Sequence, residues 1–268
     1  MARAADSGAP PGRQWRQSTV LLYLRSLLAL AIIWSLIALW VGNHVILPQP
    51  TSVAYELFRL IASGEMLVHA AVSLWRLALS YALAALIGIP LGLLMGLWPW
   101  ASDLLDPVVE ILRPISGIAW IPLALFIFGI GNELPIFIIT YVALFPFLLN
   151  TMAGVRATDR TLVRAARTMG VDQRTIVRHV MIPSALPQIL TGARIAGGAA
   201  WMSLVAAELI GAPSGLGFAI EWYRQLLMTP KVIAVIVVIS LLGYLTDRGL
   251  RWLQQRLTPW STGIGANP

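Results

Sequence analysis

The sequence predicts an all-α integral membrane protein with about six transmembrane helices, and three observations support this. First, only 12% of the 268 residues are charged, whereas a soluble domain usually has about a quarter. Second, the mean hydropathy is +0.77, and the apolar residues form stretches of about 20 residues, the length that crosses a bilayer. Third, the basic residues are distributed unevenly between the segments that join these stretches, as the positive-inside rule describes.

Six stretches are apolar enough to be spans, some of them with mild interruptions. The third is broken by three prolines, Pro107, Pro114 and Pro122, and non-helical backbone at membrane depth is tolerated where it lines a cavity or is buried in protein. The expected spans are Val20–Val41, Leu77–Trp98, Ser102–Ile130, Leu134–Met152, Ile189–Ile210 and Val232–Leu245.

The basic residues predict that both ends of the chain face the cytoplasm. Thirteen of the 19 lysines and arginines lie in segments 1–25, 98–101, 153–188 and 246–268. Four lie in the alternate segments, 42–76, 131–133 and 211–231: Arg59, Arg76, Arg224 and Lys231. Cytoplasmic loops carry the excess of basic residues, so the first set is expected inside the cell.

This topology divides the chain into four parts. Residues 1–19 form a cytoplasmic tail, and residues 20–64 hold the first span and the start of an external amphipathic loop. Residues 65–255 form the core with a cytoplasmic loop at 153–188, and residues 256–268 form a second cytoplasmic tail. The external loop Asn43–Arg76 is expected to be partly helical, with Pro48 and Pro50 as stops, and to lie along the outer face of the membrane.

Several function classes are excluded by composition. The chain has no cysteine, which excludes disulfides and thiolate metal sites. Three scattered histidines give no metal site, and no Ser/His/Asp constellation is apparent. The only lysine, Lys231, is not part of a G-x-x-x-x-G-K-[ST] loop, so the chain cannot cradle ATP phosphates by that device. The net charge of +7 does not indicate nucleic acid, because membrane topology accounts for most of it.

The most informative cytoplasmic stretch is "RAARTMGVDQRTIVRHVMIP", residues 164–183. Apolar side chains at i, i+3, i+4 and i+7 predict one face of a helix, and arginines occupy its flank. The apolar set is Leu162, Ala165, Ala166 and Met169, and the basic set is Arg160, Arg164 and Arg167.

Local signals divide this stretch into two helices. Gly170 suits the left-handed position that ends a helix, Asp172 is a candidate N-cap for a second helix through Val180, and Pro183 is expected to stop it. The apolar face is too small to be a core, so it needs a cover. Pattern alone leaves two covers open: a partner protein or the anionic headgroups of the membrane.

The same stretch resembles the EAA loop of ABC-importer permeases, whose pattern is Glu-Ala-Ala-x-x-x-Gly, nine residues, then Ile-x-Leu-Pro. Ala165, Ala166 and Gly170 fit in register, and the final positions are filled by Val180, Ile182 and Pro183. Arg164 stands where the pattern has Glu.

Two further segments are similar to the branch of this family that imports nitrate, taurine and alkanesulfonates. They are "LLDPVVEILRPISGIAWIPLALFIFGIG" and "LVAAELIGAPSGLGFAI". The resemblance implies a type I ABC-importer transmembrane domain in the inner membrane of a prokaryote. By this resemblance, the domain would move a small solute, expected to be an anion such as a sulfonate, taurine, nitrate or bicarbonate.

The resemblance also implies the partners and the coupling residues. The EAA loop would dock into a cytoplasmic ABC ATPase, which binds ATP and Mg²⁺, so no cofactor is expected in this chain. An extracytoplasmic solute-binding protein, a second permease copy in a homodimer and the lipid bilayer complete the expected set, and nucleic acid is not expected. The coupling residues would be Leu162, Arg164, Ala165, Ala166, Arg167, Met169, Gly170, Val180, Ile182 and Pro183.

Embedded charges are the candidates for the translocation pathway, because ionisable groups in a bilayer are costly and tend to be functional or paired. Glu110 and Arg113 are three residues apart and can pair on one helix face or across a dimer. Arg113 to Trp120 is the segment expected to line the pathway, with a kinked packing helix as the alternative. Glu208 is a further candidate, although bracing of the "GAPSGLG" turn suits a carboxylate better than contact with an anion.

Gly88, Gly92 and Gly96 recur every four residues, which predicts close packing against another helix. The alternative for the whole chain is a stand-alone membrane protein, either a secondary carrier or a membrane enzyme, whose basic loop lies on lipid headgroups. A secondary carrier would be expected to show an inverted repeat, and a membrane enzyme a set of convergent polar groups. Neither pattern is apparent in the sequence.

Overall fold

The computed structural model describes residues 12–261, except for the side chains of residues 12–24, 27 and 261. Within that range every regular element is a helix. In chain order they are α1 (Gly12–Val41), α2 (Pro50–Ala62), α3 (Glu65–Leu97), α4 (Pro99–Leu112), η1 (Gly117–Trp120), α5 (Ile121–Phe128), α6 (Glu133–Arg156), α7 (Arg160–Thr168), α8 (Gln173–Ile176), η2 (Val177–Met181), α9 (Ile182–Gly211), α10 (Leu216–Gln225), α11 (Thr229–Leu257) and η3 (Pro259–Ser261).

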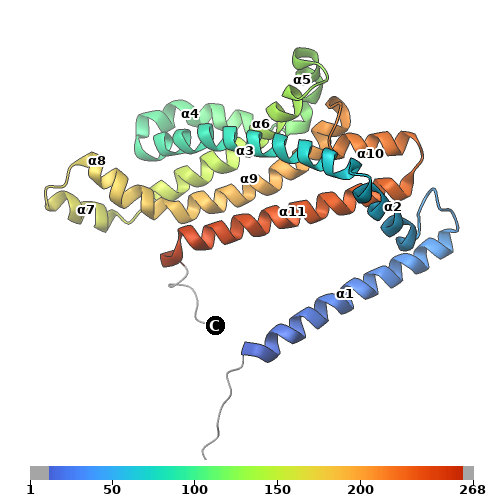
Figure 1. Ribbon diagram of the computed structural model, residues 1–268. Helices are drawn as coiled ribbons and strands as arrows, with labels where there is room; N and C mark the ends of the chain where they lie inside the picture. The colour runs from blue at the N-terminus through green and yellow to red at the C-terminus, as the bar shows by residue number, and fades with distance from the viewer. Residues whose placement is uncertain (1–11, 262–268) are drawn as a thin grey trace, which may run out of the picture.

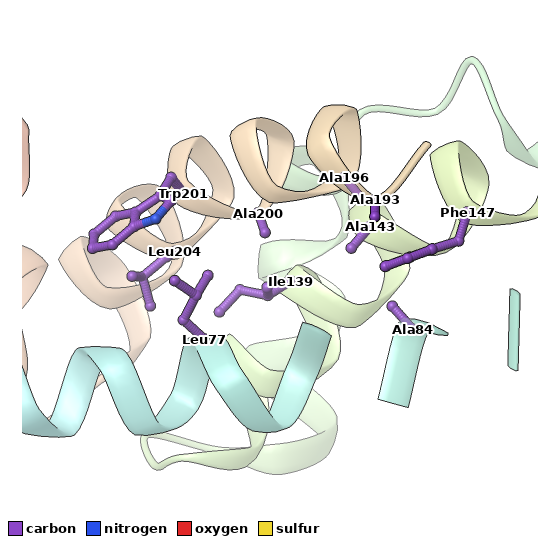
Figure 2. Packing of buried hydrophobic residues seen from close by; sticks show 10 residues of the cluster. All are labelled: Leu77, Ala84, Ile139, Ala143, Phe147, Ala193, Ala196, Ala200, Trp201 and Leu204. Carbon is purple, nitrogen blue, oxygen red and sulfur yellow. The ribbon is translucent and has the colours of Figure 1, made fainter. Parts of the chain in front are cut away.

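Three long helices, α3, α6 and α9, form the centre of the molecule (Figure 1). Their facing side chains make one buried cluster, in which alanines from all three helices, most of them from α9, pack among larger residues (Figure 2). Small residues let the helix backbones approach closely, which drives helix association in a bilayer where apolar burial alone does not. The labelled members are Leu77, Ala84, Ile139, Ala143, Phe147, Ala193, Ala196, Ala200, Trp201 and Leu204.

The glycine repeat of α3 faces α6, which confirms the predicted close packing. A Cβ added at Gly88 would lie 2.9 Å from the Leu144 carbonyl oxygen, and one at Gly96 would lie 2.8 Å from the Val155 Cβ. Both distances are shorter than ordinary van der Waals contact, so any larger residue would force the two helices apart. The repeat therefore sets the spacing of α3 and α6.

Four helices are long and apolar enough to cross a membrane, and a fifth span exists if α4 and the η1–α5 segment are counted together. The four are α3, the continuous helix from Gln173 to Gly211, α6 and α11. The pair that corresponds to the proline-rich third span is bent by 80°, so this span is a broken one. The first expected span falls in α1, where the described residues form a shorter apolar segment, Leu28–Val41.

The expected external loop is helical in its first half, as the sequence predicts. Pro50 occupies the first turn of α2, where proline is well tolerated, so it starts a helix instead of stopping one. Val53 and Leu60 are buried in a cluster with α10 and α11.

The second half of that loop was assigned wrongly. Residues 65–76 belong to α3, and the Arg76 side chain is fully buried. An arginine is tolerated at this position because Glu208 compensates its charge, as buried charges require. Arg76 was expected in the external loop because the second span was taken to begin at Leu77, whereas α3 begins at Glu65.

Candidate functional site

The α7–α8 hairpin lies at one end of the long helices (Figure 1) and is shaped by local signals in its sequence. The Asp159 carboxylate caps α7 by accepting a hydrogen bond from the Thr161 N–H at 2.7 Å. Gly170 ends α7 at a φ of +77°, which confirms the left-handed position expected for it. Asp172 caps α8, as predicted, by accepting hydrogen bonds from the N–H groups of residues 174 and 175.

The hydrogen bonds at the two caps lower the pKa of both aspartates. Those from Thr175 contribute most for Asp172, and those from Thr161 contribute most for Asp159. A hydrogen bond to the ionised form favours that form. The first turns of α7 and of α8 are therefore each capped by a carboxylate that remains charged at neutral pH.

The predicted stop at Pro183 is wrong. The helix that begins at Gln173 continues through the π-helical turn η2 into α9 and ends at Gly211. Within η2 the Ile182 N–H donates to the Val177 carbonyl, five residues back. Proline cannot donate and its ring crowds the preceding turn. The wider π turn confines the disruption caused by Pro183 to a single bulge, so the helix continues beyond it.

The apolar face of α7 borders a groove of about 420 Å³ between α7, the η2–α9 junction and η3. Ala166 is buried, whereas Leu162 is 54% and Met169 75% exposed. An exposed methionine of this kind is typical of adaptable contact surfaces. Six of the ten expected coupling residues line the groove, together with Trp260: Leu162, Ala165, Ala166, Met169, Val180 and Pro183.

The remaining expected coupling residues lie elsewhere on the hairpin. Arg164 and Arg167 line a separate hollow of about 470 Å³ on the basic side of α7. Gly170 is at the turn, and Ile182 is half-buried at the start of α9. The helix α7 thus presents two faces, one apolar and one basic.

The bend between α4 and η1 borders a hollow of about 550 Å³. Arg113 and the backbone through Ile118 form one wall, and α6 and α9 form the others. The Tyr141 hydroxyl donates to the Leu112 carbonyl at 2.6 Å, which also accepts from the Ile115 N–H at 3.1 Å where α4 ends. The Trp120 ring meets the Tyr141 ring edge-on, with 5.6 Å between centroids.

The candidate pathway residues therefore separate. Arg113 lines the hollow, and Trp120 packs against a lining residue. Glu110 is exposed on α4, and its expected pairing with Arg113 is not among the ion pairs of the described residues.

Glu208 lies outside that hollow, in a buried polar network. The Arg76 guanidinium donates to the Glu208 carboxylate at 2.7 Å, and both side chains have 0% exposure. The Ser73 hydroxyl and the Gly217 N–H also donate to this carboxylate. Glu208 therefore fastens α3 to the turn between α9 and α10.

Arg76 completes the network on its other side. Its Nε and Nη2 donate to the Asn132 Oδ1, and its Nη1 donates to the Ser214 carbonyl at 2.5 Å. Arg76 was not predicted from the sequence as part of a buried site. The signal was present, because Ser73, Arg76 and Ser80 recur every three or four residues and so mark a polar stripe on a helix that begins before position 77.

A bundle of long apolar helices with a broken span, a hollow beside the break and an exposed hairpin at one end defines a membrane-embedded transport subunit. The family model described as "Binding-protein-dependent transport system inner membrane component" matches residues 88–259. The chain belongs to this family and is therefore an inner-membrane permease subunit of an ABC importer.

Individual relatives agree with this assignment. The chain is 39% identical over 237 residues to the taurine transport system permease protein TauC of Escherichia coli (strain K12), covering 86% of each chain. It is 34% identical over 266 residues to the bicarbonate transport system permease protein CmpB of Synechococcus elongatus, covering 93% of this chain and 95% of the relative. A chain of the inward-facing MetNI methionine ABC transporter matches the fold with a TM-score of 0.62 at 23% identity, covering 72% of this chain and 96% of that one.

Proposed function

We propose that this permease moves a small anion into the cytoplasm, with a sulfonate, taurine, nitrate or bicarbonate as the candidate solutes. Two observations support an anion. Relatives that are 34–39% identical are named for taurine, aliphatic sulfonates and bicarbonate. The hollow at the broken span also presents the Arg113 guanidinium, a group that recognises carboxylates and other oxyanions.

The energy for transport comes from a cytoplasmic ABC ATPase that docks on the α7–α8 hairpin. The observation that carries this assignment is the exposed apolar face of α7 beside its groove, at the position of the EAA-like pattern. Such a face is suited to a partner protein that covers it. ATP and Mg²⁺ bind to that partner, because this sequence has no phosphate-cradling loop.

The complete importer contains further subunits. A solute-binding protein delivers the anion on the outer side, and a second copy of this chain forms the other half of the pathway. The description of the family to which the chain belongs, a binding-protein-dependent system, supports the first of these partners. The same membership argues against a stand-alone carrier or a membrane enzyme.

The docking proposal is tested by Gly170→Leu in the complete transporter reconstituted in vesicles. A Cβ at Gly170 meets no atom within 4 Å, so the change acts through the backbone, whose φ of +77° disfavours any side chain. The left-handed conformation costs a residue with a Cβ about 1–2 kcal/mol, which distorts the turn between α7 and α8. We expect solute uptake per ATP hydrolysed to fall, while membrane insertion is unchanged.

Gly249→Leu is the matched control. Gly249 lies within α11, its φ is not in the left-handed region, and an added Cβ meets no atom within 4 Å. Uptake should stay at the wild-type rate in this variant. Wild-type coupling in Gly170→Leu would show that the hairpin does not transmit energy from the ATPase.

A further inference from the structure

The basic side of α7 closes a second hollow, of about 470 Å³, that is separate from the apolar groove of the coupling proposal, although two of its arginines, Arg164 and Arg167, are among the expected coupling residues. Its walls come from the end of α6, from α7 and from the last turn of α3. The apolar set and the basic set of α7 each recur at helical spacing, so the groove and this hollow lie on different faces of the same helix. Four arginines line the hollow: Arg156, Arg160, Arg164 and Arg167.

These four guanidinium groups have no carboxylate partner among the ion pairs of the described residues. Arg156 donates to the Ser102 hydroxyl at 2.6 Å, and Arg167 donates to the Gln173 amide oxygen at 3.1 Å. The nearest acidic residues in sequence, Asp159 and Asp172, use their carboxylates as helix caps. The Asp106 carboxylate reaches Arg156 only through the Ser102 hydroxyl. Four like charges around one hollow repel each other, so an anion bound among them would be stabilising.

The residues at the inner end of the hollow indicate its level relative to the membrane. Gly96, at the end of α3, lines it, and the next two aromatic residues of the chain, Trp98 and Trp100, are 47% and 61% exposed. Tryptophans with such exposure gather at the level of lipid headgroups. The hollow therefore opens where headgroup phosphates lie.

We propose that this basic hollow, lined by Arg156, Arg160, Arg164 and Arg167, binds the phosphate of an anionic phospholipid headgroup. Arginine forms paired hydrogen bonds with phosphate oxygens, and basic pockets between membrane helices on the cytoplasmic side bind anionic headgroups. The volume is within the range of small-molecule sites. Because the lipid lies against the basic face, the apolar face of α7 stays free for the ATPase, and neither proposal depends on the other.

The Arg→Gln double variant R160Q/R164Q tests the site in the full-length chain, purified in mild detergent with its companion subunits. Binding of phosphatidylglycerol and of phosphatidylcholine is measured by native mass spectrometry during lipid titration. Each arginine near an anionic lipid contributes enough for about a fivefold change in affinity, so the double variant should bind phosphatidylglycerol about 25-fold more weakly. The wild-type chain should prefer phosphatidylglycerol, and added salt should weaken that preference.

Two further variants separate binding from folding. Arg178→Gln removes the same charge from an exposed arginine of η2 that does not line the hollow, and its lipid affinity should stay within about twofold of wild type, since a single surface charge contributes little. The variant R160K/R164K keeps the positive charge and should retain most of the preference.

Three outcomes would overturn the proposal. The first is equal binding of the two lipids by the wild-type chain. The second is unchanged phosphatidylglycerol binding by a folded R160Q/R164Q. The third is loss of the companion ATPase from that variant with lipid binding intact, which would assign the hollow to an acidic surface of the partner protein.

Discussion

The buried pair of Arg76 and Glu208 gives the sharpest test of how this fold is held together. Glu208→Gln keeps the size of the side chain and removes its charge. The Arg76 guanidinium would then remain buried with its neutral partners, Asn132 and Ser214, but without a counter-charge. The new amide would also present an N–H₂ group to the Gly217 N–H, which now donates to a carboxylate oxygen at 2.9 Å.

The magnitude follows from the complete burial of both side chains. Removing one partner of a buried pair costs about 3–5 kcal/mol, because the other charge is left uncompensated. In a chain of this length that loss lowers Tm by roughly 6–20 °C. Adding Arg76→Met should recover part of the lost stability, since the double variant has no lone buried charge. The recovered part is the coupling energy of the pair, which is about 0.5–3 kcal/mol for residues in contact.

Thermal unfolding in lipid nanodiscs, followed by tryptophan fluorescence, measures these differences. Glu221→Gln is the control, because Glu221 pairs with Arg224 on the surface, where the Arg224 side chain is 66% exposed. It should shift Tm little, as surface pairs do. If Glu208→Gln unfolds at the wild-type temperature, or if Arg76→Met adds its full cost to it, the pair does not hold α3 to the turn between α9 and α10.

Three other perturbations address the packing, the hollow and the cap. Gly92→Ala places a Cβ 2.7 Å from a side chain of α6, which should cost about 1–3 kcal/mol of stability in the same unfolding assay. Gly198→Ala in α9 is the control, because its Cβ would meet no atom within 4 Å, and it should be neutral. Arg113→Glu should slow uptake of a radiolabelled anion without changing assembly, and wild-type uptake would remove Arg113 from the pathway. Asp172 has a pKa lowered from 3.8 by hydrogen bonds led by those from Thr175, so its cap stabilises α8 above pH 3.8 and is lost as the pH falls below that value. The protection of the hairpin amides against hydrogen exchange, relative to their intrinsic rate at the same pH, should fall there in the wild type and already at neutral pH in Asp172→Ala.

Structural features that depend only on neighbouring residues are the ones best predicted from the sequence. Gly170 ends α7 and Asp172 caps α8 because each depends only on backbone conformation within a few positions. The spacing of Gly88, Gly92 and Gly96 likewise predicts a close helix contact, although it does not identify α6 as the partner. Helix ends and packing faces of this kind follow from the period of the helix and from simple sterics.

Features that depend on distant partners were missed. Arg76 reads as a loop residue until Glu208, 132 positions away, is known to neutralise it. Pro183 reads as a stop, because the sequence does not show that a π turn will accommodate it. The three prolines of the third span predict a broken helix, but the 80° bend is set by packing against α6. In each case tertiary contacts override a rule that is correct locally.

The continuity of the helix from Gln173 to Gly211 has a mechanical consequence. At 1.5 Å per residue, its 39 residues make a rod of about 58 Å that begins next to the α7 groove and ends three residues beyond Glu208. A rod of that length moves its far end by about 1 Å for each degree of tilt. A small tilt at the hairpin end of this helix would therefore produce a larger displacement at the opposite side of the membrane. The turn held by Arg76 lies at that end.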